Sequence, residues 1–261
     1  MTHTVLKRFL GFIVANLLML FFVTLIYAQT TQSMLAQAEY DVKELENMVQ
    51  AHPSVTYESF HKIDLFIGTQ VSITVNNAKL AGLNTVALEK RLKRIEHTLH
   101  ERNLMRVMNE MENFSKLNPG DEKLGTRIEV NVWSWRYAFK EAKVKGVLVS
   151  QTREKRRKEL ELLAFERNAE HALKEFRDFV ECKPSRFASR GVIYGWNVYH
   201  DDLHYQTLLA VQLVEALETP NALRISSDYD SLKSDYSKKF FVNGPVHGLG
   251  GMRDYGDVCG K

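Results

Sequence analysis

The chain has 261 residues and a net charge of +3, and 44% of its residues are hydrophobic while 26% are charged. This composition is typical of a globular protein with a packed core. The small net charge argues against nucleic acid or another bulk electrostatic partner, and two cysteines are too few for a zinc site made of thiolates alone.

Residues 9–28 form an uncharged apolar run that, as a helix, would match the hydrocarbon thickness of a bilayer. The pattern predicts a transmembrane signal-anchor helix. Lys7 and Arg8 precede the run, and the next basic residue is Lys43, which predicts that residues 1–8 are cytoplasmic. We therefore expect a single-pass inner-membrane protein whose bulk is periplasmic or otherwise extracytoplasmic. A cleaved signal peptide is the alternative, but Ile26 is bulky where cleavage requires a small residue.

The following segment, residues 29–52, contains neither glycine nor proline, and we expect it to continue as a helical stalk. Its apolar residues recur at alternating steps of three and four positions: Leu35, Ala38, Val42, Leu45 and Val49. This spacing is typical of a short coiled-coil seam, but also of an amphipathic helix that packs on its own domain. The sequence leaves both interpretations open.

Residues 53–241 are predicted to form one mixed domain that is mainly α with minor β. Alternation at period two predicts strands at about residues 70–76, 128–132 and 191–199. Trp133, Trp135 and Tyr137 follow the second of these and fit a continued strand, but the same stretch also fits a helix from Trp133 to Leu148, which we favour because residues 138–143 are largely good helix formers. Its predicted apolar side is formed by Trp133, Tyr137, Val144 and Leu148.

Steps of three and four also predict helices over residues 85–116, 153–181 and 201–218. The run from Asp228 to Asp235 holds three carboxylates but lacks the glycine and the closing glutamate of a calcium loop, which favours a polar turn. Residues 242–261 contain six of the 14 glycines and are predicted to form a loop-like tail.

Two pairs of residues are candidates for site chemistry. His200 and His204 lie at positions i and i+4 of a predicted helix, a spacing that lets two imidazoles share one metal ion. No third ligand follows at a recognisable spacing, so the alternative is two polar residues at a helix start. Cys182 and Cys259 are candidates for a disulfide that would tie the end of a long helix to the C-terminus, and the alternative is two unrelated thiols.

No catalytic motif stands out, which favours a non-enzymatic protein without a cofactor. The expected function is protein–protein interaction or self-association through the extracytoplasmic domain, as in an envelope assembly, secretion or conjugation complex. One alternative is a metal-binding protein or hydrolase that uses His200 and His204. Another is a ligand-sensing domain in which Trp133, Trp135 and Trp196 line a pocket.

Overall fold

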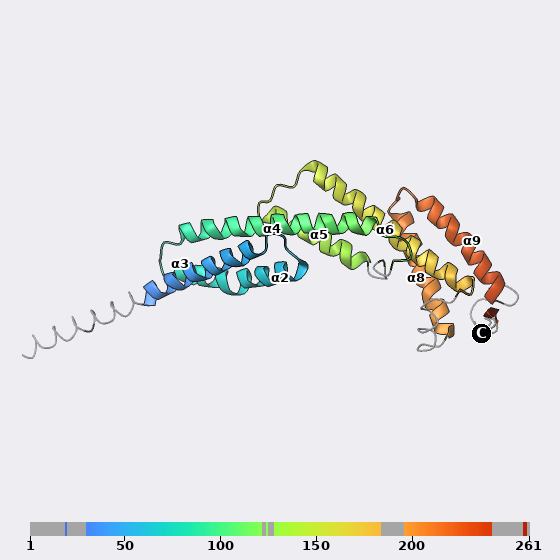
Figure 1. Ribbon diagram of the computed structural model, residues 1–261, viewed down its shortest axis with the longest axis horizontal. Helices are drawn as coiled ribbons and strands as arrows, with labels where there is room; N and C mark the ends of the chain where they lie inside the picture. The colour runs from blue at the N-terminus through green and yellow to red at the C-terminus, as the bar shows by residue number, and fades with distance from the viewer. Residues whose placement is uncertain are drawn as a thin grey trace, which may run out of the picture. The chain divides into compact units, whose positions relative to one another are not determined.

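The computed structural model describes residues 19, 30–121, 124, 128–183, 196–241 and 258–259. In these residues the protein is built from helices and contains no β-strand (Figure 1). The mainly α prediction is therefore confirmed, and the prediction of minor β is wrong. A helix over residues 30–51 is followed by α2 (Tyr57–Phe66), the π-helical turn η1 (Ile67–Val71), α3 (Ser72–Leu80), α4 (Val86–Ser115), α5 (Ile128–Val144), α6 (Gln151–Val180), α8 (Trp196–Ala216) and α9 (Ala222–Phe240).

No helix within the described ranges is long and apolar enough to cross a bilayer. This finding contradicts the predicted transmembrane signal-anchor, the single membrane span and the inner-membrane location. The long described helices α4, α5, α6, α8 and α9 all carry charged side chains, whereas a spanning helix is apolar on every side. Residues 9–28, apart from Met19, lie outside the described residues, as do residues 1–8 and most of the predicted tail.

The chain divides into two compact units. Of the described residues, 30–106 and 141–148 belong to the first unit, and 107–140 together with 149 onward belong to the second. Helices α4 and α5 contribute residues to both units.

The core of the first unit gathers apolar residues from the helix over 30–51, from α2 to α3, and from the first half of α4. The predicted seam takes part in this core, because Ala38, Val42, Leu45 and Val49 are buried and Leu35 packs against them. This is the packing of an amphipathic helix on its own domain, which is the second of the two interpretations of this segment.

The predicted strand at residues 70–76 is wrong, because this segment spans η1 and α3. The buried residues are Ile67, Val71, Val75 and Ala78, at steps of four, four and three, while Ile73 remains half exposed. Steps of four drift around a regular α-helix, and the wider π-turn compensates for that drift. The alternation of β-branched and polar residues is therefore not reflected in burial.

The predicted strand at residues 128–132 is also wrong, because these residues begin α5. The helix expected after them is present, but it buries the opposite side. Its core-facing residues are Ile128, Val132, Trp135, Phe139 and Ala142, whereas Trp133, Tyr137, Val144 and Leu148 are exposed. Of the third predicted strand, residues 191–195 lie outside the described ranges and residues 196–199 begin α8.

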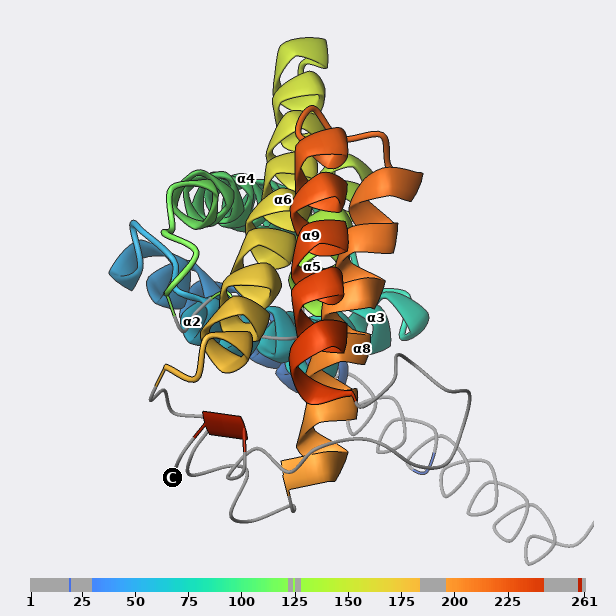
Figure 2. The same ribbon diagram turned by 90° about the vertical axis from the view of Figure 1, so that its right-hand side faces the viewer.

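In the second unit, α6, α8 and α9 pack side by side (Figure 2). The buried side of α9 consists of Ile225, Tyr229, Leu232, Tyr236 and Phe240, at steps of four, three, four and four. The carboxylate run from Asp228 to Asp235 is therefore helical rather than a polar turn. Its buried residues Tyr229 and Leu232 fit the helical period, which the charged residues between them obscure in the sequence.

Among the helices that the structure describes, four end in Schellman motifs, in which two backbone N–H groups donate back to carbonyls of the last turn. The left-handed residue of each motif is Gly82 after α3, Gly146 after α5, Cys182 after α6 and Glu218 after α8. Glycine adopts this conformation without steric cost, whereas the other two residues do not. The motif after α6 places Cys182 where the chain turns away from the helix.

Candidate functional site

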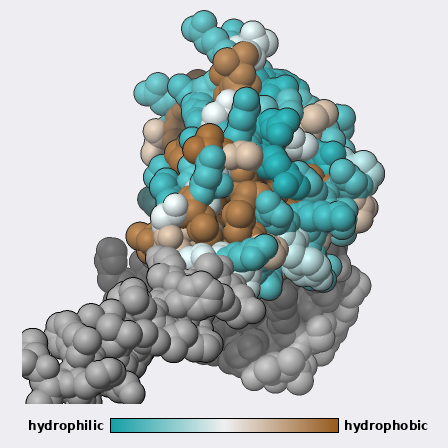
Figure 3. All heavy atoms as spheres, turned by 90° about the vertical axis from the view of Figure 1, so that its left-hand side faces the viewer, coloured by the Kyte–Doolittle hydropathy of each residue, from teal (hydrophilic) through white to brown (hydrophobic). Residues whose placement is uncertain are grey.

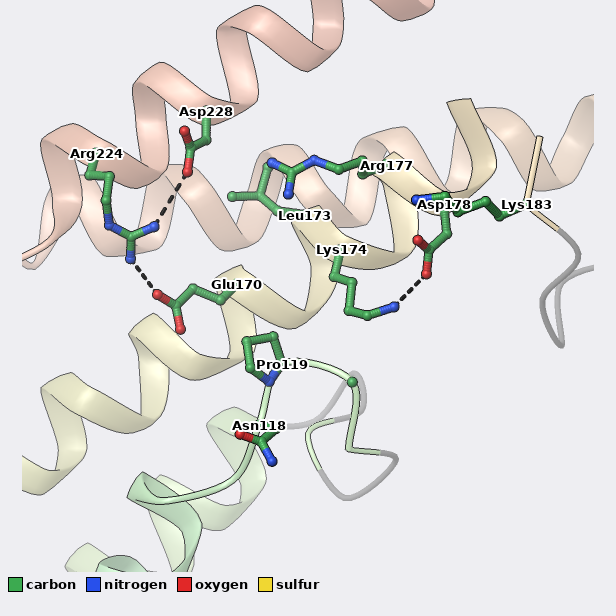
Figure 4. A pocket seen from close by; sticks show the side chains of 11 residues that line it. Asn118, Pro119, Glu170, Leu173, Lys174, Arg177, Asp178, Lys183, Arg224 and Asp228 are labelled. Carbon is green, nitrogen blue, oxygen red and sulfur yellow. Dashed lines mark hydrogen bonds and ion pairs between the residues drawn. The ribbon is translucent and has the colours of Figure 1, made fainter. Parts of the chain in front are cut away.

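The second unit has an open groove between α6, α9 and the loop that follows α4 (Figure 4). Its volume is about 640 Å³. The lining combines the loop with charged side chains of the two helices: Asn118, Pro119, Gly120, Glu170, Leu173, Lys174, Arg177, Asp178, Lys183, Arg224 and Asp228.

The loop wall of the groove is fixed to α6 by buried contacts. The imidazole of His171 is buried, and its Nδ1 lies 2.6 Å from the carbonyl oxygen of Pro119. Because a carbonyl only accepts, Nδ1 is the donor. Arg167 Nε donates to the carbonyl of Ser115 at 3.2 Å, where α4 ends. These two bonds attach both ends of the turn to α6.

Ion pairs hold most of the charged side chains of the groove. The Arg224 guanidinium on α9 bonds to Glu170 on α6 and lies 3.3 Å from Asp228, one turn further along α9. On α6, the ammonium of Lys174 lies 2.5 Å from the carboxylate of Asp178. The three carboxylates of the lining are thus each bonded to a cation, and one of these pairs joins the two helices.

Arg177 differs from its neighbours because its guanidinium makes no side-chain hydrogen bond or close ion pair with the residues that the structure describes, although its charge contributes to the lowered pKa of Glu181 one turn further along. In the view of Figure 4, its guanidinium lies beside Leu173, between the Arg224–Asp228 pair and the Lys174–Asp178 pair. Lys183, at the end of the groove, pairs with Glu181, and this hydrogen bond raises the pKa of Lys183 and lowers that of Glu181. The lining therefore has four cations and three carboxylates.

Comparison with known proteins finds no matching family, no matching curated sequence and no matching solved structure. The function is therefore argued from the side chains themselves.

His204 lies in an aromatic cluster of the second unit. Its Nε2 is within hydrogen-bond distance of the Tyr229 hydroxyl, at 2.9 Å, and its ring stacks on those of Tyr229 and Tyr236. Burial, reinforced by the nearby Asp230 carboxylate, raises the pKa of Tyr229 to about 12. The sequence did not suggest this His–Tyr pair, although both residues lie on helix faces that turn inward.

The metal hypothesis for His200 and His204 stays a prediction, because the side chain of His200 lies outside the part that the structure describes. Among described side chains, no group of three or more histidines, cysteines, aspartates or glutamates is placed to hold a metal ion.

Cys182 and Cys259 form a disulfide in the structure, with their Cα atoms 5.4 Å apart. Lys239, near the end of α9, contacts the end of α6 beside this disulfide. Its ammonium donates to the carbonyl oxygen of Val180 at 2.6 Å and lies 3.1 Å from Cys182 Sγ. The disulfide connects the end of α6 to a residue near the C-terminus.

The tryptophans that were expected to line a ligand pocket have different environments. Trp135 is buried, and its indole N–H donates to Glu110 at 3.1 Å, whereas Trp133 is 67% exposed. Residues two apart on a helix point to opposite sides, so Trp133 and Trp135 do not line one pocket. The side chain of Trp196 lies outside the described residues.

Trp133 instead pairs with Tyr137, which is 50% exposed. The two rings are nearly parallel, with centroids 5.5 Å apart. Exposed apolar side chains also occur elsewhere, and Figure 3 shows hydrophobic residues gathered on one face among hydrophilic ones. The sequence pattern placed Trp133 and Tyr137 on the apolar side of the predicted helix, and the structure exposes that side.

Proposed function

We propose that this chain is a non-enzymatic helical protein that binds a protein partner through the Trp133–Tyr137 pair of α5. The observation that supports the proposal is the stacking of two large aromatic rings on the outside of the second unit. Tryptophan and tyrosine are enriched in protein interfaces and at their energetic centres, because each ring buries a large area when a partner covers it.

The residues around Trp133 and Tyr137 are of the kinds found in a protein–protein interface. Arg136 is 57% exposed and Lys140 is exposed, and both lie on the same side of α5 as Trp133 and Tyr137. A protein interface typically has an aromatic centre and a polar rim. The rings are already stacked, so a partner would order fewer side-chain rotations on binding.

The groove also supports binding rather than catalysis. Its carboxylates are bonded to cations that join or stiffen α6 and α9. Such pairs hold a surface in one shape, whereas a catalytic acid or base needs a proton that it can exchange with a substrate.

The test is to place a photo-crosslinking amino acid at position 133 or at position 223 in cells that produce the protein. Leu223 is the matched control, because it is 90% exposed and belongs to the same unit. We expect one discrete adduct from position 133, either with a second copy or with one other protein, and none from position 223.

The partner identified in that adduct is then purified and its affinity measured. Trp133→Ala should weaken binding at least about tenfold, as expected for an aromatic residue at the centre of an interface. Leu223→Ala should change it less than about twofold. Equal crosslinking from both positions, or an affinity unchanged by Trp133→Ala, would contradict the proposal.

A further inference from the structure

We infer that the groove between α6, α9 and the Asn118–Gly120 loop binds an acidic segment of a protein, with one carboxylate held by Arg177. The inference rests on the proposed function because it takes the ligand to be a protein. It concerns a second surface of the same unit and has its own test.

The guanidinium of Arg177 is available to bind a carboxylate. Arg224 and Lys174 already bond to carboxylates of the groove, whereas the Arg177 guanidinium makes no hydrogen bond or close ion pair among the described residues and acts on Glu181 only at longer range. A guanidinium presents parallel N–H groups that match the two oxygens of a carboxylate. Arg177 lines the groove, and in the view of Figure 4 its guanidinium lies beside Leu173.

The charges of the lining limit which anion the groove can accept. Arg224 and Lys174 bond to the three carboxylates of the lining, and Lys183 pairs with Glu181 outside it, so the guanidinium of Arg177 is the cation of the lining that is left without such a bond. A dense polyanion such as nucleic acid would be repelled by the three carboxylates. A peptide with separated carboxylates places one of them at Arg177 and keeps the others away from Glu170 and Asp228.

Contacts between the loop, α6 and α9 hold the groove in one shape. His171 and Arg167 hold the loop against α6, and Arg224 joins α6 to α9 through Glu170. A groove whose walls are held by such contacts needs little rearrangement to bind an extended segment. Pro119 and Leu173 add apolar surface between the charged side chains.

The test uses fluorescence anisotropy with a labelled short peptide of alternating glutamate and leucine. A second peptide, in which glutamine replaces each glutamate, removes the charge and keeps the size. We expect the acidic peptide to bind and the glutamine peptide to bind at least about tenfold more weakly, since a charged bidentate pair is stronger than a neutral one. Unlabelled inorganic phosphate and single-stranded DNA serve as competitors.

Arg177→Gln is the deciding variant, and Lys158→Gln is its control. Lys158 is an exposed cation on the same helix that lies outside the groove lining, so its replacement removes the same charge elsewhere. Arg177→Gln should weaken binding of the acidic peptide about tenfold, and Lys158→Gln should weaken it less than about twofold. Circular dichroism checks that both variants keep their helical content.

Each outcome decides the inference. No binding of the acidic peptide, equal loss in both variants, or DNA that competes better than the unlabelled peptide would each overturn it. Any of these results leaves crosslinking from position 133 unaffected, and loss of that crosslinking leaves peptide binding to the groove unaffected. The two proposals therefore fail separately.

Discussion

The carboxylate of Glu166 on α6 caps the start of α9 by bonding twice to Asn221. The backbone N–H of Asn221 donates to one carboxylate oxygen at 2.7 Å, and its side-chain amide donates to the other at 2.9 Å. Glu166 is buried, and Asn221 is the N-cap residue of α9. A negative charge at a helix N-terminus also interacts favourably with the helix dipole. One side chain therefore satisfies an N-terminal donor of α9 and joins two helices of the second unit.

We predict that Glu166→Ala lowers the free energy of unfolding by about 2 kcal/mol, because it leaves buried donors without a charged acceptor. Glu159→Ala on the same helix is the control. Glu159 is 47% exposed and its pair with Arg156 is long, at 3.3 Å, so its loss should cost about 0.5 kcal/mol or less. Urea denaturation followed by circular dichroism measures both, and equal shifts of the two midpoints would contradict the prediction.

The sequence predicts best where burial and charge both follow the helical period. Helices were expected over residues 85–116, 153–181 and 201–218, and the structure has α4, α6 and α8 in close correspondence. In α6 the buried Ala169, Leu173, Phe176 and Val180 recur at steps of three and four, so one pattern indicated both the helix and its inner side.

The sequence predicts poorly where β-branched or aromatic residues occur on both sides of a helix. In α5 the apolar residues Trp133 and Tyr137 compete with Trp135 and Phe139 for the core, and only tertiary packing decides between them. The sequence also failed to predict the groove, and the reason is related. Its walls come from segments that are distant in sequence, and Glu170 meets Arg224 only when α6 and α9 are packed.

We predict a loss of stability in alkaline solution that depends on Tyr229. Its pKa in the folded state is about 12, above the ordinary value of 10.0, so the folded state holds the phenolic proton more tightly. Below pH 10 the phenol keeps its proton in both the folded and the unfolded state, so the free energy of unfolding does not depend on the ionisation of this group. As the pH rises from 10 toward about 12, the unfolded state loses the proton first, and the free energy of unfolding falls by about 3 kcal/mol.

Tyr229→Phe has no phenolic proton to lose, so its free energy of unfolding should fall less steeply between pH 10 and about 12. Its cost at neutral pH should be about 1 kcal/mol, because the hydroxyl is 2.9 Å from His204 Nε2. Tyr205→Phe, which alters a 55% exposed ring, is the control and should keep the wild-type slope. Urea midpoints measured across alkaline pH decide the matter, and identical slopes for all three proteins would refute the assignment to Tyr229.

We predict that Glu218→Gly stabilises the protein. Glu218 has a φ of +49° at the left-handed position of the motif after α8, where an L-residue costs about 1–2 kcal/mol. Part of the gain is offset because glycine is more flexible in the unfolded chain, which leaves about 0.5–1 kcal/mol. Glu218→Ala keeps the Cβ atom and should bring no such gain. If the melting temperature rose equally in both variants, the gain would come from removing the charge of Glu218 and not from relieving backbone strain.

The last prediction concerns the disulfide between Cys182 and Cys259. The bond joins residues that are 77 positions apart, and closing a loop of that length destabilises the unfolded chain by about 4.5 kcal/mol in the chain-entropy account. Cys182→Ser and Cys259→Ser should each cost about this much, and the double variant should cost no more than either, because all three remove the same bond. Denaturation of wild type with and without reductant provides the comparison. If the two single effects added in the double variant, or if reductant left the wild-type midpoint unchanged, the stabilisation could not be assigned to the bond.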